Sequence, residues 1–422
     1  MTMALPAIFF SMLFLGVPIA FIIFALSVYC VVNNPALMDF VLAQRIILGA
    51  QSFPLLAVPL FILVGELMNL SGISNKVMAF CAVLTRKMTG GLAQTNILLS
   101  CLLAGMSGSS NADAAMQAKF LVPQMVKRGY PLEFATALTA ASALISPMIP
   151  PGICLILFGF AANVSIGQMF IAAIIPGILL AIGLMVTTHF YVKIKKFKLV
   201  GCEQEVSQGL ASTFVAALPA IVLPVFIVIG IRFGVFTPTE AASVAVVYCL
   251  YLCWRYGTLE ANPLYKILQN TAFATSAIIL VLVASSAFSW VVTFEQIPQQ
   301  ISHFLIGLNA GPTLTLALLA LLLLVLGMFI EGTALVLILG PMFIPVMQAM
   351  GVDLIHYGIV FVFMTHLGGV SPPVGVVMFT ACSVTGVRID KCIRAIMPYI
   401  LTVMCVGVLL IIFPQLSTLF TN

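Results

Sequence analysis

Charged side chains are scarce in this chain of 422 residues, because Lys, Arg, Asp and Glu together make up only 7% of it. An average soluble domain carries roughly 25% of these residues. Hydrophobic residue types make up 62% of the chain. This composition excludes a soluble globular domain and is typical of a helical protein that crosses a bilayer several times.

Motifs for catalysis and for transition-metal binding are also absent. The sequence contains no C-x-x-C pair, and its Cys residues are scattered, mostly within apolar runs, as small buried hydrophobic residues are. The four His residues are dispersed, and neither H-E-x-x-H nor G-x-S-x-G occurs. We therefore expect no enzyme. The net charge of +5 is explained by the loops and predicts no nucleic-acid partner.

The apolar runs predict membrane-spanning helices. They are too long for the strands of a membrane barrel, which alternate over about ten residues. An all-α polytopic membrane protein is therefore predicted, with Leu5–Val32 as a single first span that is retained. Further spans are predicted at Phe53–Leu70, Phe170–Val192, Phe214–Phe233, Thr239–Trp254, Ala272–Phe294 and Ala395–Phe413, with interfacial segments at Leu37–Ala50 and Asn75–Lys87.

A polar stretch, Gly105–Asp113, separates two apolar runs in the first half of the chain. Each run is shorter than the roughly 20 residues that a helix needs to cross a bilayer. Residues 92–127 are therefore predicted to form a re-entrant hairpin whose Gly/Ser tip is surrounded by protein or by a water-filled cavity. The alternative is a tight turn between two ordinary helices. A second hairpin is predicted at about residues 314–347.

Two further spans are interrupted by proline and glycine. Ser146–Gly152 lies within the span at about 132–160, and Gly368–Gly375 lies within the span at about 354–383. Proline lacks the backbone donor and clashes with the preceding turn, so neither helix is expected to continue. Both segments are predicted to be broken helices, of the kind that bind solutes and ions in transporters.

The same glycine and proline positions recur after 222 residues. Gly105 corresponds to Gly327, Pro123 to Pro345, and Gly129 to Gly351; Pro150 and Pro151 correspond to Pro372 and Pro373. This repeat predicts a first unit at 1–200, a connector at 201–235 and a second unit at 236–422. The predicted units are separated by an odd number of crossings, so an inverted-topology repeat follows.

The basic residues predict the orientation. With the N-terminus in the cytoplasm and the C-terminus in the periplasm, Arg45 and Arg232 fall outside, and Lys119 lies within the first hairpin. The remaining basic residues fall on the cytoplasmic side, as the positive-inside rule requires. They are Lys76, Arg86, Lys87, Lys127, Arg128, Lys193, Lys195, Lys196, Lys198, Arg255, Lys266, Arg388, Lys391 and Arg394.

Each hairpin tip and the break facing it are predicted to form a site for a sodium ion and an anionic solute. Hydroxyl and carbonyl oxygens suit a hard cation, and helix ends freed at a break offer partial charges of either sign. The candidate solute-binding residues are Ser107, Asn111, Asp113, Glu331, Thr333 and His366. The candidate sodium ligands are Ser109, Ser110, Ser146, Ile149, Gly332, Thr333, Gly369 and Ser371.

Intramembrane carboxylates are functional candidates by default. Asp113 and Glu331 lie at the tips, although each is also placed to cap a helix. Glu66 is either a coupling residue or a buried structural group. Glu240 is interpreted as structural, because Thr237–Glu240 has capping-box spacing.

Several motifs together resemble the large membrane subunit of tripartite ATP-independent periplasmic (TRAP) transporters. They are Leu55–Glu66, Ser107–Ser110, Ile149–Gly152, Phe236–Ala241 and Pro372–Gly375, and the resemblance covers almost the whole chain. It implies sodium-coupled uptake of an organic acid, sialic acid or a C4-dicarboxylate, by an elevator motion in the bacterial inner membrane. It also implies a separate small four-helix membrane subunit and a periplasmic substrate-binding protein. Glu331 departs from the Asp expected at its position.

Two other classes of membrane protein share part of this pattern. A self-sufficient ion-coupled dicarboxylate carrier or exchanger of similar build would need no binding protein. A channel would not need two inverted hairpin sites.

The predicted cation sites can be tested by removing one hydroxyl from each tip. Ser110→Ala and Thr333→Ala should each raise the sodium concentration for half-maximal uptake by roughly fivefold, because a lost ligand is worth about 1 kcal/mol. Uptake into proteoliposomes as a function of sodium concentration measures this. An unchanged sodium dependence in both variants would remove these hydroxyls from the ion sites.

Overall fold

The computed structural model describes residues 4–34, 37–51, 53–197, 209–307 and 311–420, and the described residues are helical apart from turns and short connections. Lys198 and residues 201–208 of the predicted connector lie outside this part of the chain. The first helices are α1 (Ala4–Phe14), α2 (Ile19–Asn33), α3 (Asp39–Ala50), the 3-10 turn η1 (Phe53–Leu56), α4 (Ala57–Leu70), α5 (Ile73–Thr85), α6 (Gly91–Ser107), α7 (Ser110–Lys127), α8 (Leu132–Ser142), the 3-10 turn η2 (Ala143–Ile145), α9 (Ile153–Ala161) and α10 (Ile166–Lys195). The rest are α11 (Leu210–Arg232), α12 (Pro238–Arg255), α13 (Ala261–Phe294), α14 (Ile297–Gly307), α15 (Pro312–Gly327), α16 (Gly332–Ala349), α17 (Leu354–Val370), α18 (Val376–Thr385), α19 (Ile389–Ile412) and α20 (Gln415–Thr418).

The predicted single span Leu5–Val32 is wrong. The segment folds as two short helices, α1 and α2, which pack against each other. Gly16 between them adopts a positive φ of 77°, and Pro18 stands immediately before α2. A glycine in the left-handed region ends a helix, and a proline starts the next one, so an apolar run of sufficient length is nonetheless divided.

In the part of the chain that the structure describes, five helices are long and apolar enough to cross a membrane: α10, α11, α13, α16 and α19. The pair α4 and α5 would provide a sixth span, but the chain bends by 73° between them. Gly72, with a φ of 69°, lies at this bend. The helix direction therefore changes where span Phe53–Leu70 was predicted to end.

The predicted breaks coincide with the observed ends of helices. The first hairpin consists of α6 and α7, and the second of α15 and α16. The first broken span divides into α8 and α9, and the second into α17 and α18. The Pro150–Pro151 and Pro372–Pro373 peptide bonds at the two breaks are both cis.

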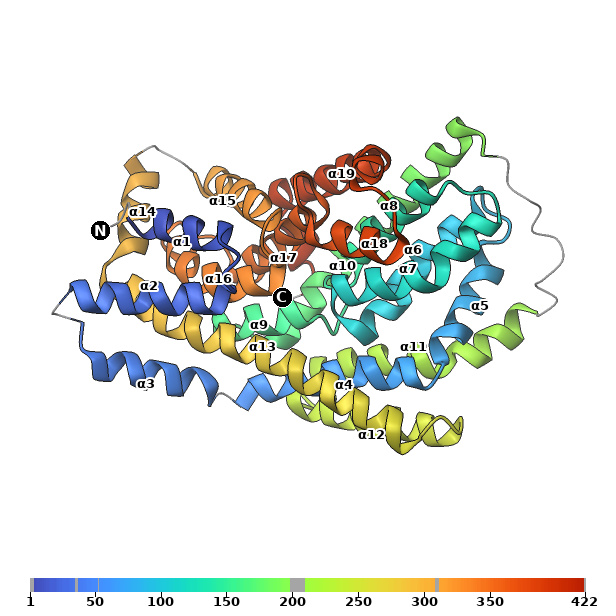
Figure 1. Ribbon diagram of the computed structural model, residues 1–422, viewed down its shortest axis with the longest axis horizontal. Coiled ribbons are helices and arrows are strands. Elements are labelled where there is room, and N and C mark those ends of the chain that lie inside the picture. The colour runs from blue at the N-terminus through green and yellow to red at the C-terminus, as the bar shows by residue number, and fades with distance from the viewer. Residues whose placement is uncertain (1–3, 35–36, 52, 198–208, 308–310, 421–422) are drawn as a thin grey trace.

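The helices are arranged so that the hairpins and broken helices lie together. Helix α13 runs diagonally across α2, α3, α4 and α16, while α4 also packs on α12 and α11 packs on α5 (Figure 1). In this view α3, α4, α12 and α13 form a layer along the lower side of the molecule, and α16 lies above it (Figure 1). The hairpin tips and the breaks are held against each other on the inner side of that layer.

Two glycines allow the second hairpin to approach its broken helix. A Cβ atom on Gly368 would lie 2.5 Å from the Leu324 carbonyl oxygen and 2.6 Å from the Gly327 Cα atom. Helices α15 and α17 therefore touch backbone to backbone, and any side chain at Gly368 would push them apart.

Gly368→Ala should accordingly destabilise the protein. Overpacking of this kind costs about 1–3 kcal/mol, so we expect the thermal unfolding temperature in detergent to fall by roughly 2–6 °C. Gly340→Ala in α16 is the matched control, because the nearest atom to its added Cβ is the Ala161 Cβ at 3.9 Å. Equal unfolding temperatures for the two variants would contradict the close packing.

Candidate functional site

A cavity of about 350 Å³ lies where the two hairpin tips meet the two breaks. Helices α4, α9, α13, α17 and α18 complete its wall. The residues that line it are Ile62, Gly65, Glu66, Asn69, Ser107–Ala112, Ile153, Cys154, Ala274, Ala277, Ile278, Glu331, Gly332, Thr333, Thr365, His366, Gly369, Val376 and Val377. The two sites predicted separately from the sequence are therefore parts of one cavity.

The first tip is a tight turn packed on the first break. Gly108 ends α6 with a φ of 59°, and a Cβ atom there would lie 2.8 Å from the Pro151 carbonyl oxygen. The Ser109 hydroxyl caps α7 by accepting from the Ala112 amide at 3.5 Å. Ser107 Oγ lies 3.0 Å from Ser146 Oγ at the break. The conformation available to glycine thus brings the tip and the break into contact.

Asp113 is a buried carboxylate with an unmatched oxygen. Its side chain is 0% exposed, and Ser107 Oγ donates to its Oδ1 at 3.1 Å. Within the described part of the chain, Oδ2 has no partner, and neither has the buried hydroxyl of Ser110. A buried carboxylate without a compensating charge is strongly unfavourable. A cation bound beside Asp113 would supply that charge.

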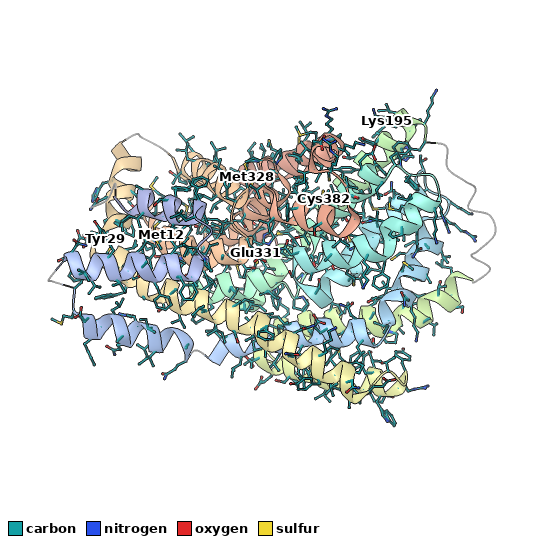
Figure 2. The ribbon with its side chains drawn as sticks, viewed as in Figure 1. Met12, Tyr29, Lys195, Met328, Glu331 and Cys382 are labelled. Atoms are coloured by element: carbon teal, nitrogen blue, oxygen red, sulfur yellow. The ribbon has the colours of Figure 1, made fainter. Side chains whose placement is uncertain are left out.

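The second tip touches the first across the cavity. Asn111 Nδ2 donates to Glu331 Oε1 at 3.1 Å, which joins residues 220 positions apart. Figure 2 shows Glu331 near the centre of the molecule, between helices of the two hairpins. Glu331 stands immediately before α16 but makes no capping hydrogen bond. Its carboxylate therefore accepts a hydrogen bond from the other tip and does not cap α16.

His366 presents an acceptor nitrogen beside the second tip. Its Nδ1 lies 2.6 Å from the Val362 carbonyl oxygen, so Nδ1 carries the proton and Nε2 is left as an acceptor. Nε2 lies 3.6 Å from Cys154 Sγ, which is also 3.5 Å from Thr333 Oγ1. A Cβ atom on Gly332 would lie 2.6 Å from the imidazole Cε1. A larger residue at Gly332 would require the imidazole ring of His366 to shift.

Most predicted site residues line the cavity, and the others lie beside it. Asp113 borders a small adjoining void that it shares with Ser107 and Asn69. Ser146 reaches the cavity through Ser107, whereas the Ser371 hydroxyl donates to the Leu367 carbonyl at 2.8 Å. Ile149 packs near Gly177 of α10. That any of the predicted residues binds sodium or the solute stays a prediction.

Sequence reasoning missed several residues of the wall. Cys154 was interpreted as a small buried hydrophobic residue, although its place directly after the first break is a signal that it lies near the tip. Ala274, Ala277 and Ile278 come from the middle of α13, where no local pattern distinguishes them. Glu66 was left open between two roles, and it lines the cavity one helical turn from Asn69.

The electrostatics of the cavity are one-sided. Among the described residues that line it, Glu66 and Glu331 are acidic, and none is Lys or Arg. No cluster of three His, Cys, Asp or Glu side chains suited to a metal ion occurs in the described ranges. The available donors are hydroxyl, amide and carboxylate oxygens, which suit an alkali cation.

The chain is similar to known transport proteins along its length. It matches the family "Tripartite ATP-independent periplasmic transporter, DctM component" over residues 7–416. It is 36% identical over 413 residues to the sialic acid TRAP transporter large permease protein SiaM of Vibrio cholerae, covering 97% of this chain and 96% of that one. It is 32% identical to the C4-dicarboxylate TRAP transporter large permease protein DctM of Pseudomonas aeruginosa, covering 90% and 89%. The solved YdaH transporter of Alcanivorax borkumensis has the same fold, with a TM-score of 0.65 at 14% identity over 88% of this chain and 86% of that one.

The buried carboxylate yields a prediction. Asp113→Asn should abolish stabilisation by sodium, which amounts to about 2.7 kcal/mol at a hundredfold excess over Kd for a bound ion. The variant should also unfold at a higher temperature than the native protein in sodium-free buffer, because the uncompensated charge is gone. Thermal unfolding in detergent with sodium or choline chloride measures both effects.

Asp353→Asn is the control for the loss of a carboxylate. Asp353 caps α17 by accepting from the His356 amide at 2.8 Å, and Asn caps helices equally well. This variant should keep the sodium-dependent increment. If Asp113→Asn keeps it too, Asp113 is not part of a sodium site.

Proposed function

This chain belongs to the DctM family of tripartite ATP-independent periplasmic transporters, the large permeases, and we propose that it imports an organic acid together with sodium ions. The family is one of transporters, so the chain is a multi-pass membrane transport protein and not an enzyme. The alternative of a self-sufficient carrier is disfavoured by this family membership.

The observation that carries sodium coupling is the charge of the cavity. An organic acid arrives as an anion, yet Glu66 and Glu331 line the cavity and Asp113 lies beside it. Without a cation, the solute would be repelled by like charges in a medium of low dielectric constant. Sodium ions bound at the tips would reverse the sign of the local potential. Solute and sodium would then bind together, which is the requirement of a symporter.

The inverted repeat is supported by the helix boundaries. Shifting α7 by 222 residues maps Ser110 to 332 and Lys127 to 349, the ends of α16. The same shift maps the first residue of α8 to 354, which is the first residue of α17. We propose that the hairpins and broken helices move as one unit against the layer of α4 and α11–α13. This motion would carry the cavity across the membrane as an elevator.

We further propose that the chain acts with a small membrane subunit and a substrate-binding protein in the bacterial inner membrane. The N-terminus would be cytoplasmic and the C-terminus periplasmic, as the positive-inside rule predicts. A cavity of about 350 Å³ is of a size for a small organic acid. The names of the relatives make sialic acid and C4-dicarboxylates the candidate solutes.

The deciding experiment is uptake by proteoliposomes that contain this chain and its small subunit. An inward sodium gradient is imposed, and labelled sialic acid or succinate is offered with and without the substrate-binding protein. We expect uptake only with both sodium and the binding protein, and uptake of one acid in large excess over the other.

Two controls accompany this experiment. A potassium gradient of equal size tests the ion, and Glu240→Gln tests for loss of fold, because Glu240 serves a helix cap and lies outside the cavity. Uptake without the binding protein would favour the self-sufficient carrier. Uptake that is indifferent to sodium would overturn the proposed coupling.

A further inference from the structure

Two further cavities each have one basic residue in their lining. The first, of about 420 Å³, is lined by α4–α7 and α18, and we call it the Lys119 vestibule. It shares Asn69 with the central cavity, and it shares Leu103 and Met116 with the small void beside Asp113. Its other lining residues include Ala115, Gln117, Ser74 and Asn75. The three spaces therefore adjoin one another along one face of α7.

The Lys119 vestibule contains polar groups that are only partly paired among the described residues. Lys119 is exposed and makes no ion pair among the described residues. Gln117 is 1% exposed; its Nε2 donates to Ser100 Oγ at 2.8 Å, and its Oε1 has no partner. Lys119 is the one lysine or arginine among the described residues that line this vestibule, the void and the central cavity.

The second cavity, of about 490 Å³, lies between α3 and α13 on one side and α9 and α16 on the other, and we call it the Arg45 vestibule. Ser286 Oγ donates to the Arg45 carbonyl at 3.2 Å, which seats α3 on α13 where Gly49 permits close approach. Ser285 is 4% exposed, lines the cavity, and its hydroxyl has no partner among the described residues.

The Arg45 vestibule differs from the Lys119 vestibule in its position. Within the described part of the chain, it shares no lining residue with the central cavity or with the void beside Asp113. The Lys119 vestibule is thus the one of the two that adjoins the site, and the Arg45 vestibule is a separate space that also has one basic residue.

We infer that the Lys119 vestibule is a transient binding site for the carboxylate of the transported acid, on the cytoplasmic side of the central cavity. This inference rests on the proposed function. The central cavity is acidic, so an anion that enters or leaves it benefits from a cation in the adjoining space. Cationic clefts raise the local concentration of anions by roughly tenfold or more.

The local potential can be measured without transport. Ala115→Cys and Ser289→Cys place a thiol in the Lys119 and Arg45 vestibules respectively, in a Cys405→Ser background that removes an exposed native thiol. Rates of modification by an anionic and a cationic methanethiosulfonate reagent are compared in an uncharged detergent, after subtraction of the rate in the background protein.

Reciprocal substitutions make each vestibule the control for the other. Lys119→Gln should lower the ratio of anionic to cationic rate at Ala115→Cys by roughly tenfold, because each reagent feels the lost charge in the opposite sense. It should leave Ser289→Cys unchanged, whereas Arg45→Gln should do the reverse. Lys127→Gln on the same helix, outside the vestibule, should change neither ratio. An unchanged ratio at Ala115→Cys would overturn the inference.

A transport measurement tests whether the charge of Lys119 acts on the solute. The proteoliposomes have the binding protein outside and unlabelled acid inside. Lys119→Gln should raise, by roughly fivefold, the internal acid concentration that has half of its maximal effect on the initial rate of uptake. Its external half-saturation should be unchanged, and Lys119→Arg should restore the internal value. A higher internal ionic strength should reduce the difference between the native protein and Lys119→Gln, since salt screens exposed charges. A symmetric loss of rate would overturn the role of Lys119 in the vestibule.

A lipid phosphate could also bind to Lys119 or Arg45, and one further measurement distinguishes it from the acid. The labelling ratios are repeated in phosphatidylcholine vesicles with and without phosphatidylglycerol. A ratio that falls with phosphatidylglycerol, but not with the acid, would assign the Lys119 vestibule to a lipid headgroup and overturn the proposal. If the native protein shows no sodium-dependent uptake, the proposed function fails, while the labelling ratios still report on the vestibules.

Discussion

Helices that end inside the protein leave polar backbone groups that must find partners there, and the structure depends on this constraint. The first tip meets it with the Ser109 cap and with the close approach of Gly108 to the first break. The second tip meets it where the Gly375 amide donates to the Met328 carbonyl at 3.0 Å. Each tip is therefore stabilised by the break that faces it, and the cavity is formed by that mutual requirement.

Charge is distributed so that the cavity and its surroundings have opposite character. Carboxylates line or adjoin the central space, whereas single basic residues stand in two separate vestibules, of which the one with Lys119 adjoins that space. With the proposed function, such an arrangement would bind an anion only weakly until cations enter. Lys119 would hold the anion near the entrance on its side. Coupling and guidance would thus be supplied by different residues, which makes them separable by mutation.

The elements that could be predicted are those with local signals. Glycine and proline at the tips and breaks directly restrict the backbone, so hairpins 92–127 and 314–347 were predicted within a few residues of their observed ends. The error at Leu5–Val32 arose because the length of the apolar run was given more weight than Gly16 and Pro18, which divide it. Hydropathy reports burial in apolar surroundings and carries no information about where a helix turns.

The sequence by itself determined the class of protein, the polar tips, the breaks and their recurrence after 222 residues, because each depends on residue type and spacing alone. Only the tertiary structure decided that the two tips share one cavity, since the Asn111–Glu331 contact joins residues far apart in the chain. It also placed Cys154 in the wall and Lys119 and Arg45 in separate vestibules. Such neighbours are chosen by helix packing, which the order of residues in one segment does not encode.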